Sequence, residues 1–314
     1  MRFLVTGANG FVGRAMCAEL ASRGYPVRGA ARTSIACTDA FVNASIDGST
    51  RWGEALEHID VVVHLAARVH VMNEVAVDPL PEFLQANVDG TLNLARQAVH
   101  AGVRRFVYVS SVKVLGECTA PGACFSEHSE PDPQDPYATS KFRAELGLLE
   151  LAQQTGLEVV IVRPPLVYGP GVRANFAKLL NVVSRGIPLP FKGIANRRSL
   201  IFVGNLVDAL IHCASHPAAV GQTYLVDDGA PISSSGLVEM MAAELGVPNR
   251  DFFLPVALMR FGAAFLRRQA SVERLTQSLA VDSGKIRSHL DWAPPFETVE
   301  GMRLTARWFV DQRT

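Results

Sequence analysis

Tyr137 and Lys141 stand four residues apart in the run Tyr137-Ala138-Thr139-Ser140-Lys141. On a helix this spacing puts both side chains on one face, one turn apart. An ammonium group near a phenol favours the phenolate and lowers its pKa from about 10 towards neutrality. Such a pair can exchange a proton with an alcohol or carbonyl oxygen. Ordinary helix surfaces also contain this spacing, so it indicates chemistry only if the chain supplies a hydride carrier and a hydroxyl partner.

A glycine-rich turn follows the first apolar run, Arg2 to Thr6, and precedes an amphipathic stretch. In a strand–turn–helix unit, Gly7 permits the tight turn and Gly10 lets a pyrophosphate approach the backbone. Gly13 lets the helix and the strand pack closely. The unpaired N–H groups at the start of the helix then bind phosphate. The pattern predicts a dinucleotide-binding site, which would supply the hydride carrier.

The end of the second expected strand, Pro26 to Ser34, indicates which dinucleotide is bound. It carries Arg32 and no carboxylate. An acid at this place would bind the ribose 2′-OH of NAD, whereas an arginine accommodates the 2′-phosphate of NADP. The sequence therefore favours NADP(H). NAD(H) stays possible, because an ordinary surface arginine would give the same pattern.

Two later strands also end in residues that suit a ligand site. The strand from Asp60 ends in Leu65-Ala66-Ala67, whose small side chains leave room for the ribose and nicotinamide. The strand Arg105 to Ser111 ends in hydroxyls, at the sheet edge where ligands sit in open α/β sheets. His64 belongs to a buried strand and is interpreted as a packed, hydrogen-bonded histidine. Ile46, after a short strand, is a candidate adenine contact.

The alternation of strands and helices predicts an α/β fold with a doubly wound, mainly parallel Rossmann-type sheet and a smaller C-terminal α/β substrate domain. The run Pro164 to Gly171 breaks the alternation and is the candidate boundary. We expect a dinucleotide-binding domain of residues 1–167 plus about 199–227. Residues 168–198 plus about 228–314 would bind the substrate. Helices are expected at 81–101, 137–156, 173–185, 205–215, 233–245 and 296–310, with further helical stretches in 256–279.

Composition narrows the class of protein. The chain has 314 residues, with 48% apolar and 19% charged residues and 30 basic against 30 acidic side chains. This balance predicts no nucleic-acid partner and no attraction to acidic membranes. The five cysteines form no Cys-x-x-Cys pattern, His64 and His70 have no plausible metal-ligand partners, and no apolar run approaches 18 residues. We also expect no signal peptide. We expect a cytoplasmic protein without a metal. The cysteines are Cys17, Cys37, Cys118, Cys124 and Cys213.

With the glycine turn, Leu65-Ala66-Ala67, Ser110-Ser111, Tyr137 and Lys141, and Arg163-Pro164 in this order, nearly the whole chain resembles an extended short-chain dehydrogenase/reductase. The resemblance implies a catalytic triad of Ser111, Tyr137 and Lys141. It also implies a homodimer built through the helices around 81–101 and 136–154. The expected cofactor-binding residues are Gly7, Gly10, Phe11, Val12, Arg32, Ile46, Leu65, Ala66, Ala67, Tyr137, Lys141 and Pro164.

The second half resembles the nucleotide-sugar branch of that family. The run Val167-Tyr168-Gly169-Pro170-Gly171 and the segment Val281 to Lys285 carry this likeness. In such enzymes an asparagine and arginines hold the diphosphate of a UDP- or dTDP-sugar, and a guanidinium suits phosphate through its planar fork of donors. Asn175 and Arg198 match by position, and Arg274 is a looser candidate.

The same triad serves two reactions. The stretch Ser110 to Glu117, with Lys113 inside it, resembles bacterial 4-reductases. This resemblance implies NADPH-dependent reduction of UDP-2-acetamido-2,6-dideoxy-4-hexulose to UDP-N-acetylquinovosamine for surface polysaccharide (O-antigen). Ser111, Lys113 and Tyr137 would then contact the substrate. The alternative is a UDP-glucose or UDP-N-acetylglucosamine 4-epimerase with tightly bound NAD, which Arg32 disfavours. A non-catalytic redox sensor is a third reading, disfavoured because Tyr137 and Lys141 are both present.

Overall fold

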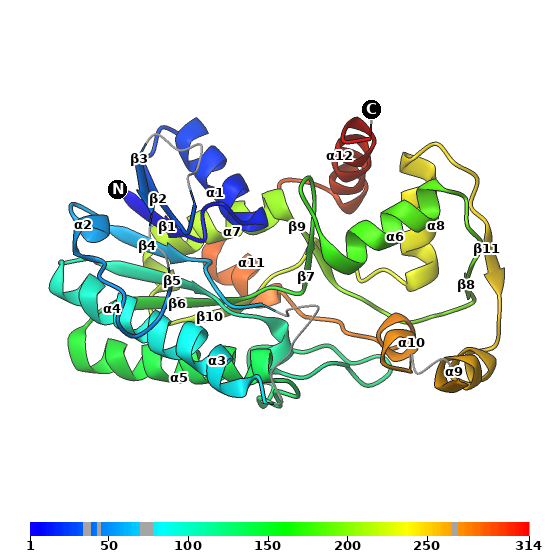
Figure 1. The fold of residues 1–314 in the computed structure, drawn as a ribbon, viewed down its shortest axis with the longest axis horizontal. Helices are drawn as coiled ribbons and strands as arrows, with labels where there is room; N and C mark the ends of the chain where they lie inside the picture. The colour runs from blue at the N-terminus through cyan, green and yellow to red at the C-terminus, as the bar shows by residue number, and fades with distance from the viewer. Residues whose placement is uncertain (34–38, 43–44, 70–77, 266–268, 314) are drawn as a thin grey trace.

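The computed structural model describes residues 1–33, 39–42, 45–69, 78–265 and 269–313. Ser34, Cys37 and His70 lie outside the described residues, and so does the side chain of Arg274. Figure 1 shows a large sheet flanked by helices, joined to a second group of helices and short strands. Among the described residues, no helix is both long enough and apolar enough to cross a membrane.

Seven parallel strands form the large sheet in the order β10-β6-β5-β4-β1-β2-β3. This arrangement confirms the predicted α/β class and the doubly wound sheet. The chain order reverses between β1 and β4, which is where such sheets bind ligands beyond their carboxyl ends. The strands are β1 (Phe3–Thr6), β2 (Val27–Ala31), β3 (Asp39–Val42), β4 (Val61–His64), β5 (Arg105–Val109), β6 (Glu158–Arg163) and β10 (Thr223–Leu225).

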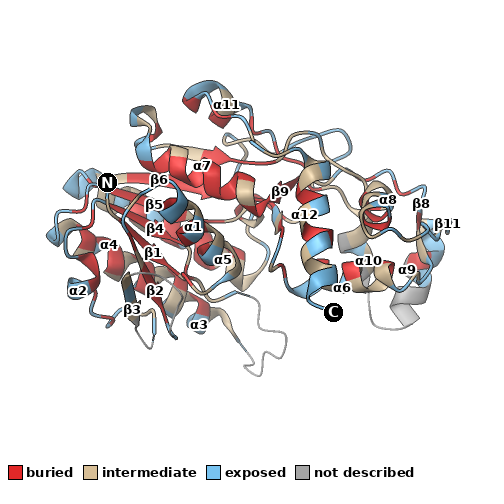
Figure 2. Cartoon of the chain, turned by 90° about the horizontal axis from the view of Figure 1, so that it is seen from above, coloured by how far each residue is buried: buried red, intermediate tan, exposed pale blue. Residues whose placement is uncertain are grey.

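Side chains alternate between the two faces of this sheet, so each strand serves two cores. Phe3 and Val5 belong to the core beneath α1, α7 and α11, whereas Leu4 belongs to the core beneath α2, α4 and α5. These buried strands are red in Figure 2. The helices of the two layers are α1 (Phe11–Ser22), α7 (Val203–Ser215), α11 (Gly284–Leu290), α2 (Gly53–Leu56), α3 (Leu80–Leu84), α4 (Gly90–His100) and α5 (Pro136–Thr155).

The helix expected over 81–101 is confirmed, since the chain is helical from Leu80 to His100, but the middle of this helix is not regular α-helix. A π-helical turn, η1 (Gln85–Asp89), separates α3 from α4. The wider turn places Asn87 inward, where it is 1% exposed and hydrogen-bonded to Arg68 and Ser140. Such single turns are frequent at functional sites. They leave no mark in the hydrophobic periodicity.

The second half of the chain has its own core, with two short parallel strand pairs. Tyr168, Phe176, Phe202 and Met302 lie within this core. Because the chain returns to the large sheet through α7, the two halves are interleaved in sequence. The division into two domains at the predicted boundaries remains a prediction. The remaining elements are β7 (Leu166–Tyr168), β9 (Leu200–Phe202), β8 (Leu189–Lys192), β11 (Asp251–Phe253), α6 (Ala174–Ser184), α8 (Ser234–Glu244), α9 (Val256–Phe265), α10 (Gln269–Thr276), α12 (Thr298–Asp311), and the 3₁₀ turns η2 (Val112–Val114) and η3 (Pro217–Ala219).

Candidate active site

Helix α5 carries Tyr137 and Lys141, and its sequence fixes where it begins and ends. Asp135 caps the helix, since its Oδ1 accepts a hydrogen bond of 2.7 Å from the N–H of Ala138. Pro136 occupies the first turn, where a missing N–H costs nothing. Gly156 ends the helix at a φ of 76°, which glycine adopts without strain. Tyr137 therefore lies in the first turn of the helix, at its electropositive end.

Ser111 meets Tyr137 at the carboxyl end of β5. The Ser111 side chain caps the turn η2 by accepting a hydrogen bond of 3.2 Å from the N–H of Lys113. A hydrogen bond between Ser111 and the Tyr137 hydroxyl acts to lower the pKa of Tyr137, but burial and the nearby Asp135 raise that pKa to about 12. The structure thus brings the two predicted hydroxyls together.

Lys141 is buried, with 2% of its surface exposed. Its Nζ donates a hydrogen bond of 2.8 Å to the carbonyl oxygen of Val109. It also lies 4.6 Å from the centre of the Tyr108 ring and 6.0 Å from that of Tyr137. Burial lowers the pKa of Lys141 to about 7, against an opposing effect of Glu145.

The pKa shifts of Tyr137 and Lys141 correct one expectation about these two residues. Lys141 was expected to lower the pKa of Tyr137, and for the polypeptide alone the pKa of Tyr137 is raised. The physical reason is that burial of the phenol, together with the negative charge of Asp135, disfavours the phenolate. The Lys141 ammonium donates its hydrogen bond to the backbone carbonyl of Val109. A charged ligand in the site would change both environments, because a like or opposite charge nearby shifts each pKa.

The glycine turn has the features that a dinucleotide pyrophosphate needs. A Cβ on Gly7 would lie 2.9 Å from the backbone nitrogen of Ala66, and one on Gly13 would lie 2.1 Å from the carbonyl oxygen of Gly7. Side chains at either place would close the approach between the turn, the helix and the neighbouring strand end. Helix α1 begins after Gly10, with no side-chain cap and no acid in its first turn. Its first N–H groups are therefore placed to bind an anion.

The other predicted cofactor residues line the same sheet edge. Ala66 and Pro164 are buried, Leu65 and Ala67 are partly buried, and Ile46 packs against Gly90, where a Cβ would lie 2.8 Å from it. The buried hydroxyl of Ser110 has no hydrogen-bond partner among the described residues, so a polar ligand group would satisfy it. A bound nicotinamide dinucleotide fits this set of residues.

Two predicted residues at this edge lie towards its rim. Arg32 is exposed just after β2, next to Thr33, whose hydroxyl accepts a hydrogen bond of 2.9 Å from Asn9. Phe11 opens helix α1 and reaches the second half of the chain. A Cβ on Gly171 would lie 3.4 Å from the Phe11 ring. Phe11 therefore lies where the glycine turn meets the loop after β7.

The predicted substrate residues are distributed over both halves. Lys113 follows Ser111 by two residues, and its Nζ pairs with Asp135 at 2.6 Å and with Glu117 at 3.0 Å. Burial acts to lower the pKa of Lys113, and these hydrogen bonds outweigh it and raise the pKa. Lys113 therefore holds Asp135, the N-cap residue of α5, in place. Whether it also contacts substrate remains a prediction.

Asn175 and Arg198 come from the second half. Asn175 is exposed in the first turn of α6 and follows Ala174, whose φ of 54° is strained for a residue with a side chain. Arg198 pairs with Ile232 through two backbone hydrogen bonds of 2.9 Å, and burial lowers the pKa of its guanidinium. Arg274 stands on α10. Their roles towards a diphosphate remain predictions.

A cavity of about 440 Å³ lies near Arg198, where the loop after η2 meets the second half. It is lined by Arg197 from the extended segment before β9, by residues 276–278, and by Cys118, Thr119, Pro121 and Gly122. Arg197 donates a hydrogen bond of 3.3 Å to the carbonyl oxygen of Gly122, and Arg198 donates one of 3.3 Å to that of Gln277, so both guanidinium groups contact residues that line the cavity. The volume is in the range typical of small-molecule sites.

His64 is confirmed as a packed histidine. Its Nδ1 lies 2.7 Å from the hydroxyl of Thr6, and its Nε2 lies 2.9 Å from that of Thr91. Burial, with a smaller contribution from Lys141, lowers the pKa of His64 to about 3. It is therefore neutral at physiological pH. Among the described residues, no group of His, Cys, Asp and Glu gathers in a way that could hold a metal.

Asn87 is a site residue that the sequence reasoning missed. Its amide donates to the Ser140 hydroxyl at 2.9 Å and to the Arg68 carbonyl at 3.0 Å, and its Oδ1 accepts from the Arg68 N–H at 2.7 Å. It thereby ties the segment after β4 to α5, on which Tyr137 stands. The run Asn87-Val88-Asp89-Gly90-Thr91 was a visible signal, but only its glycine was interpreted.

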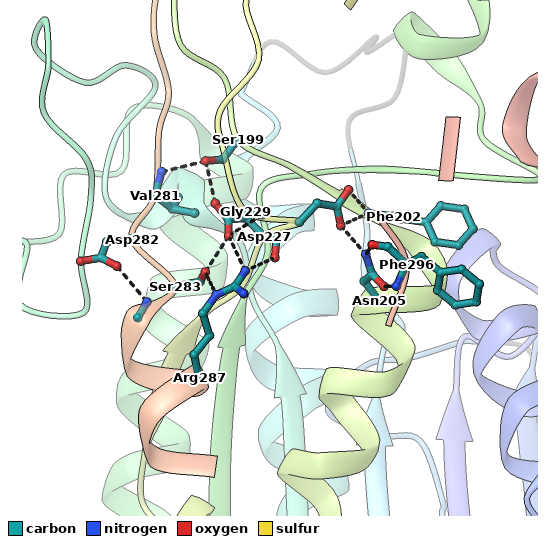
Figure 3. A network of polar contacts seen from close by, with 12 residues as sticks. Ser199, Phe202, Asn205, Asp227, Gly229, Val281, Asp282, Ser283, Arg287 and Phe296 are labelled. Atoms are coloured by element: carbon teal, nitrogen blue, oxygen red, sulfur yellow. Dashed lines mark hydrogen bonds and ion pairs between the residues drawn. The ribbon is translucent and has the colours of Figure 1, made fainter. Parts of the chain in front are cut away.

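The sequence reasoning also missed two adjacent carboxylates that follow β10, Asp227 and Asp228. Figure 3 shows Asp227 with its partners. Asp227 accepts hydrogen bonds from Ser283 at 2.6 Å and from Ser199 at 3.0 Å. Asp228 accepts from the Phe202 N–H at 2.9 Å and from Asn205 at 2.7 Å. The pair connects β9, α7, α11 and the segment before α12.

Comparison with known proteins assigns the family. Residues 3–226 match the model of the "NAD dependent epimerase/dehydratase family". The chain belongs to this family. Among curated proteins it is 40% identical to the UDP-glucose 4-epimerase of Vibrio cholerae, over 98% of this chain and 95% of that protein. It is 31% identical to the UDP-glucose 4-epimerase of Mycolicibacterium smegmatis, over 98% of both chains.

Solved structures agree with this assignment. The structure described as MoeE5 in complex with UDP-glucose and NAD is 26% identical, with a TM-score of 0.79 over the full length of both chains. The prediction of an enzyme of the extended short-chain dehydrogenase/reductase type is confirmed, and so is its dependence on a nicotinamide dinucleotide. The match to the NAD dependent epimerase/dehydratase family confirms the predicted resemblance at the level of the family. The narrower likeness to 4-reductases is not established by these matches.

Proposed function

We propose that this member of the NAD dependent epimerase/dehydratase family inverts the hydroxyl at C4 of a UDP-hexose, with NAD as its resident cofactor. The observation that carries the proposal is the grouping of Ser111, Tyr137 and Lys141 at the carboxyl end of β5, beside a glycine turn fit for a pyrophosphate. The near full-length similarity to two proteins named UDP-glucose 4-epimerase supports C4 of a UDP-sugar as the place of reaction. This was the alternative at the sequence level, and the comparisons favour it over the reductase.

A bound NAD supplies reversible hydride chemistry, which the protein itself lacks. The chain's own residues would handle the proton and the charge. Tyr137 would take the proton from the C4 hydroxyl and later return it, while Ser111 would hydrogen-bond to the same oxygen. The first N–H groups of α1 would hold the pyrophosphate of the cofactor. Asn175, Arg198 and Arg274 would hold the diphosphate of the sugar nucleotide.

Lys141 would act on Tyr137 through charge. By itself the polypeptide raises the pKa of Tyr137 to about 12, which is too high for a general base near neutral pH. Lys141 has a pKa of about 7, so a modest change in its surroundings decides whether it carries a charge. Its ammonium form would stabilise the phenolate and bring Tyr137 into its working range.

The test is made on the purified full-length protein. Denaturation should release NAD, identified by mass and absorbance, and the untreated protein should interconvert UDP-glucose and UDP-galactose, or their N-acetyl forms, without added cofactor. An enzyme that is empty after purification and reacts only when NADPH and a 4-keto UDP-sugar are supplied would overturn the proposal.

That second outcome describes the other candidate function, which one observation favours. Arg32 is exposed after β2, where an NAD-specific fold has an acid that binds the ribose. A cofactor that carries a 2′-phosphate and leaves after each turnover suits a reductase of UDP-2-acetamido-2,6-dideoxy-4-hexulose. NADP(H) would then be the cofactor and UDP-N-acetylquinovosamine the product. In either case a homodimer formed through α4 and α5 remains our prediction for the assembly.

A further inference from the structure

A buried ion pair lies behind Lys141, one helical turn further along α5. The two carboxylate oxygens of Glu145 accept hydrogen bonds of 3.0 and 2.5 Å from Nε and Nη2 of Arg163, the last residue of β6. Glu145 is 1% exposed and Arg163 is 7% exposed. A buried ion pair is weak evidence for a stabilising role, because both charges lose their hydration. Its place beside a candidate active site points to an electrostatic role.

The spacing along α5 aligns Glu145 with the candidate catalytic residues. Tyr137, Lys141 and Glu145 follow one another at intervals of four residues. Side chains at this spacing lie on one face of a helix, with neighbouring Cβ atoms about 5–6 Å apart. Lys141 and Glu145 are both buried, so little water screens their charges from each other. The helix face therefore runs from the reacting hydroxyl through an ammonium group to a carboxylate.

Glu145 is, among the described residues, the carboxylate whose charge opposes the effect of burial on Lys141. The other titratable groups around the ammonium are uncharged near neutral pH. Burial lowers the pKa of His64 to about 3, and it raises the pKa values of Tyr108 and Tyr137 above the usual range. Charged side chains on the other elements packed against α5 are either paired with one another or exposed. These are Lys113 with Asp135 and Glu117, Arg68 with Glu82, and Asp89.

Arg163 determines how the Glu145 carboxylate acts. Without another partner, a carboxylate four residues after a lysine on a helix would pair directly with the ammonium. Here both of its oxygens bind the guanidinium in a bidentate arrangement. The Lys141 ammonium donates instead to the Val109 carbonyl oxygen at 2.8 Å, and it lies 6.0 Å from the centre of the Tyr137 ring. The carboxylate thus acts on Lys141 through charge and leaves the ammonium beside Tyr137.

We propose that Glu145, held by Arg163, is a positioning residue that keeps Lys141 in its ammonium form. The inference rests on the proposed function only in that Lys141 acts on Tyr137, which both candidate reactions require. With a pKa of about 7, Lys141 has its two forms nearly balanced at neutral pH. Loss of the carboxylate would shift this balance to the neutral amine, which does not stabilise the phenolate of Tyr137.

The test measures Lys141 directly in the full-length protein as purified. The chain has five lysines, so NMR can follow the titration of their ¹³Cε signals, and Lys141→Met identifies the signal of Lys141. Glu145→Gln should lower the pKa of Lys141 by about one pH unit or more, because the favourable charge is lost while the Arg163 cation remains. Arg163→Gln should raise that pKa, because the freed carboxylate can then pair with the ammonium. Loosened packing alone would not give shifts in opposite directions.

Turnover of a UDP-hexose gives a second readout in the same variants. Because Glu145→Gln loses the ammonium at lower pH, the alkaline limb of its pH profile should move to lower pH. Its turnover should fall by about tenfold at pH 8.5 and by less at pH 6.5. If the protein converts no UDP-hexose, the proposed function fails, and the NMR titration still decides the role of Glu145.

Glu158→Gln is the matched control. Glu158 binds the buried Arg105 at 2.8 Å between β6 and β5, so this variant also leaves a buried arginine without its acid. Arg105 stands four residues before Val109 on β5, which is about 13 Å along the strand. The pKa of Lys141 should therefore be unchanged in Glu158→Gln.

The double variant Glu145→Gln with Arg163→Gln covers the case in which a single variant does not fold. It leaves neither charge buried without its partner, and it should still lower the pKa of Lys141, because the nearer charge is removed. The proposal is overturned by shifts in the same direction in both single variants, or by a shift of equal size in Glu158→Gln. An unchanged pKa of Lys141 in Glu145→Gln or in the double variant overturns it as well.

Discussion

Lys141 in the candidate active site is buried and Asp228 behind β9 is partly buried; both are charged residues, but their surroundings differ. Among the described residues, the Lys141 ammonium donates one hydrogen bond, to Val109, and otherwise faces aromatic rings. The Asp228 carboxylate accepts from Tyr168, Phe202 and Asn205. Burial disfavours the charged form of both, lowering one pKa and raising the other.

The difference separates a functional site from a structural one. Asp228 has its hydrogen bonds completed by the protein, so it holds distant elements together. The Lys141 ammonium makes one hydrogen bond among the described residues, which leaves N–H donors for a ligand, and the buried Ser110 hydroxyl has no partner there. Incomplete satisfaction of buried polar groups is costly unless a ligand completes it. The active site is therefore the region whose polar groups depend on bound cofactor and substrate.

The largest effect is expected from Tyr137→Phe. Removing the hydroxyl that exchanges a proton with C4 should lower turnover by about a thousandfold. Binding of NAD should change little, because the glycine turn is untouched. Conversion of UDP-glucose is followed by chromatography and NAD binding by fluorescence.

Tyr224→Phe is the matched control for that experiment. The Tyr224 hydroxyl bonds to His289 at 2.8 Å, away from the triad, so its loss should leave turnover nearly unchanged. Undiminished turnover in Tyr137→Phe would exclude both the epimerase and the reductase.

Asp228→Ala should have the next largest effect, and on stability. It removes the acceptor for two buried side chains and for the N–H of Phe202, which should lower the free energy of unfolding by about 2–4 kcal/mol. Asp282→Ala is the control, since the exposed Asp282 accepts only from the N–H of Gly284, at 2.8 Å, among the described residues. Its cost should be less than about 1 kcal/mol. Urea unfolding measures both, and equal losses would show that the network is not structural.

Lys141 should make the stability of cofactor-stripped protein depend on pH. In the unfolded chain Lys141 keeps its proton up to its ordinary pKa of 10.5, whereas in the folded protein that pKa is about 7. Between these values the unfolded state binds more protons, so the free energy of unfolding rises with pH. The rise is at most about 1.4 kcal/mol per pH unit.

The measurement compares urea unfolding of the unaltered protein and Lys141→Met at pH 7 and pH 9. This range avoids the opposite contribution of Tyr137, whose raised pKa favours the unfolded state only above about pH 10. The variant should be less dependent on pH. Parallel pH profiles would show that burial does not perturb Lys141.

The same comparison explains what could be predicted from the sequence. Tyr137 and Lys141 lie one helical turn apart, and the glycine turn is local, so spacing and residue type were enough to find them. The strands of the large sheet were predicted from apolar runs of strand length, whereas their number and order in the sheet came from the structure. The network of Asp228 could not be found, because Tyr168 and Asn205 are remote in sequence and no local pattern announces them. The pKa of Tyr137 depends on burial and on the nearby charge of Asp135, which only the structure supplies.

The smallest effect is expected at Arg32, whose charge is neither buried nor enclosed by the protein. If Arg32 pairs with a 2′-phosphate, Arg32→Ala should raise the Kd for NADPH by about tenfold and change that for NADH by less than about twofold. The NADPH advantage of the unaltered protein should also shrink with added salt, because an exposed ion pair is screened. Arg51→Ala, at another exposed arginine, is the control and should alter neither Kd. Equal Kd values for both cofactors in the unaltered protein, with no response to Arg32→Ala, would make Arg32 an ordinary surface residue. The strongest sequence argument for a reductase would then be lost, and tightly held NAD in an epimerase would be the simpler account of the site.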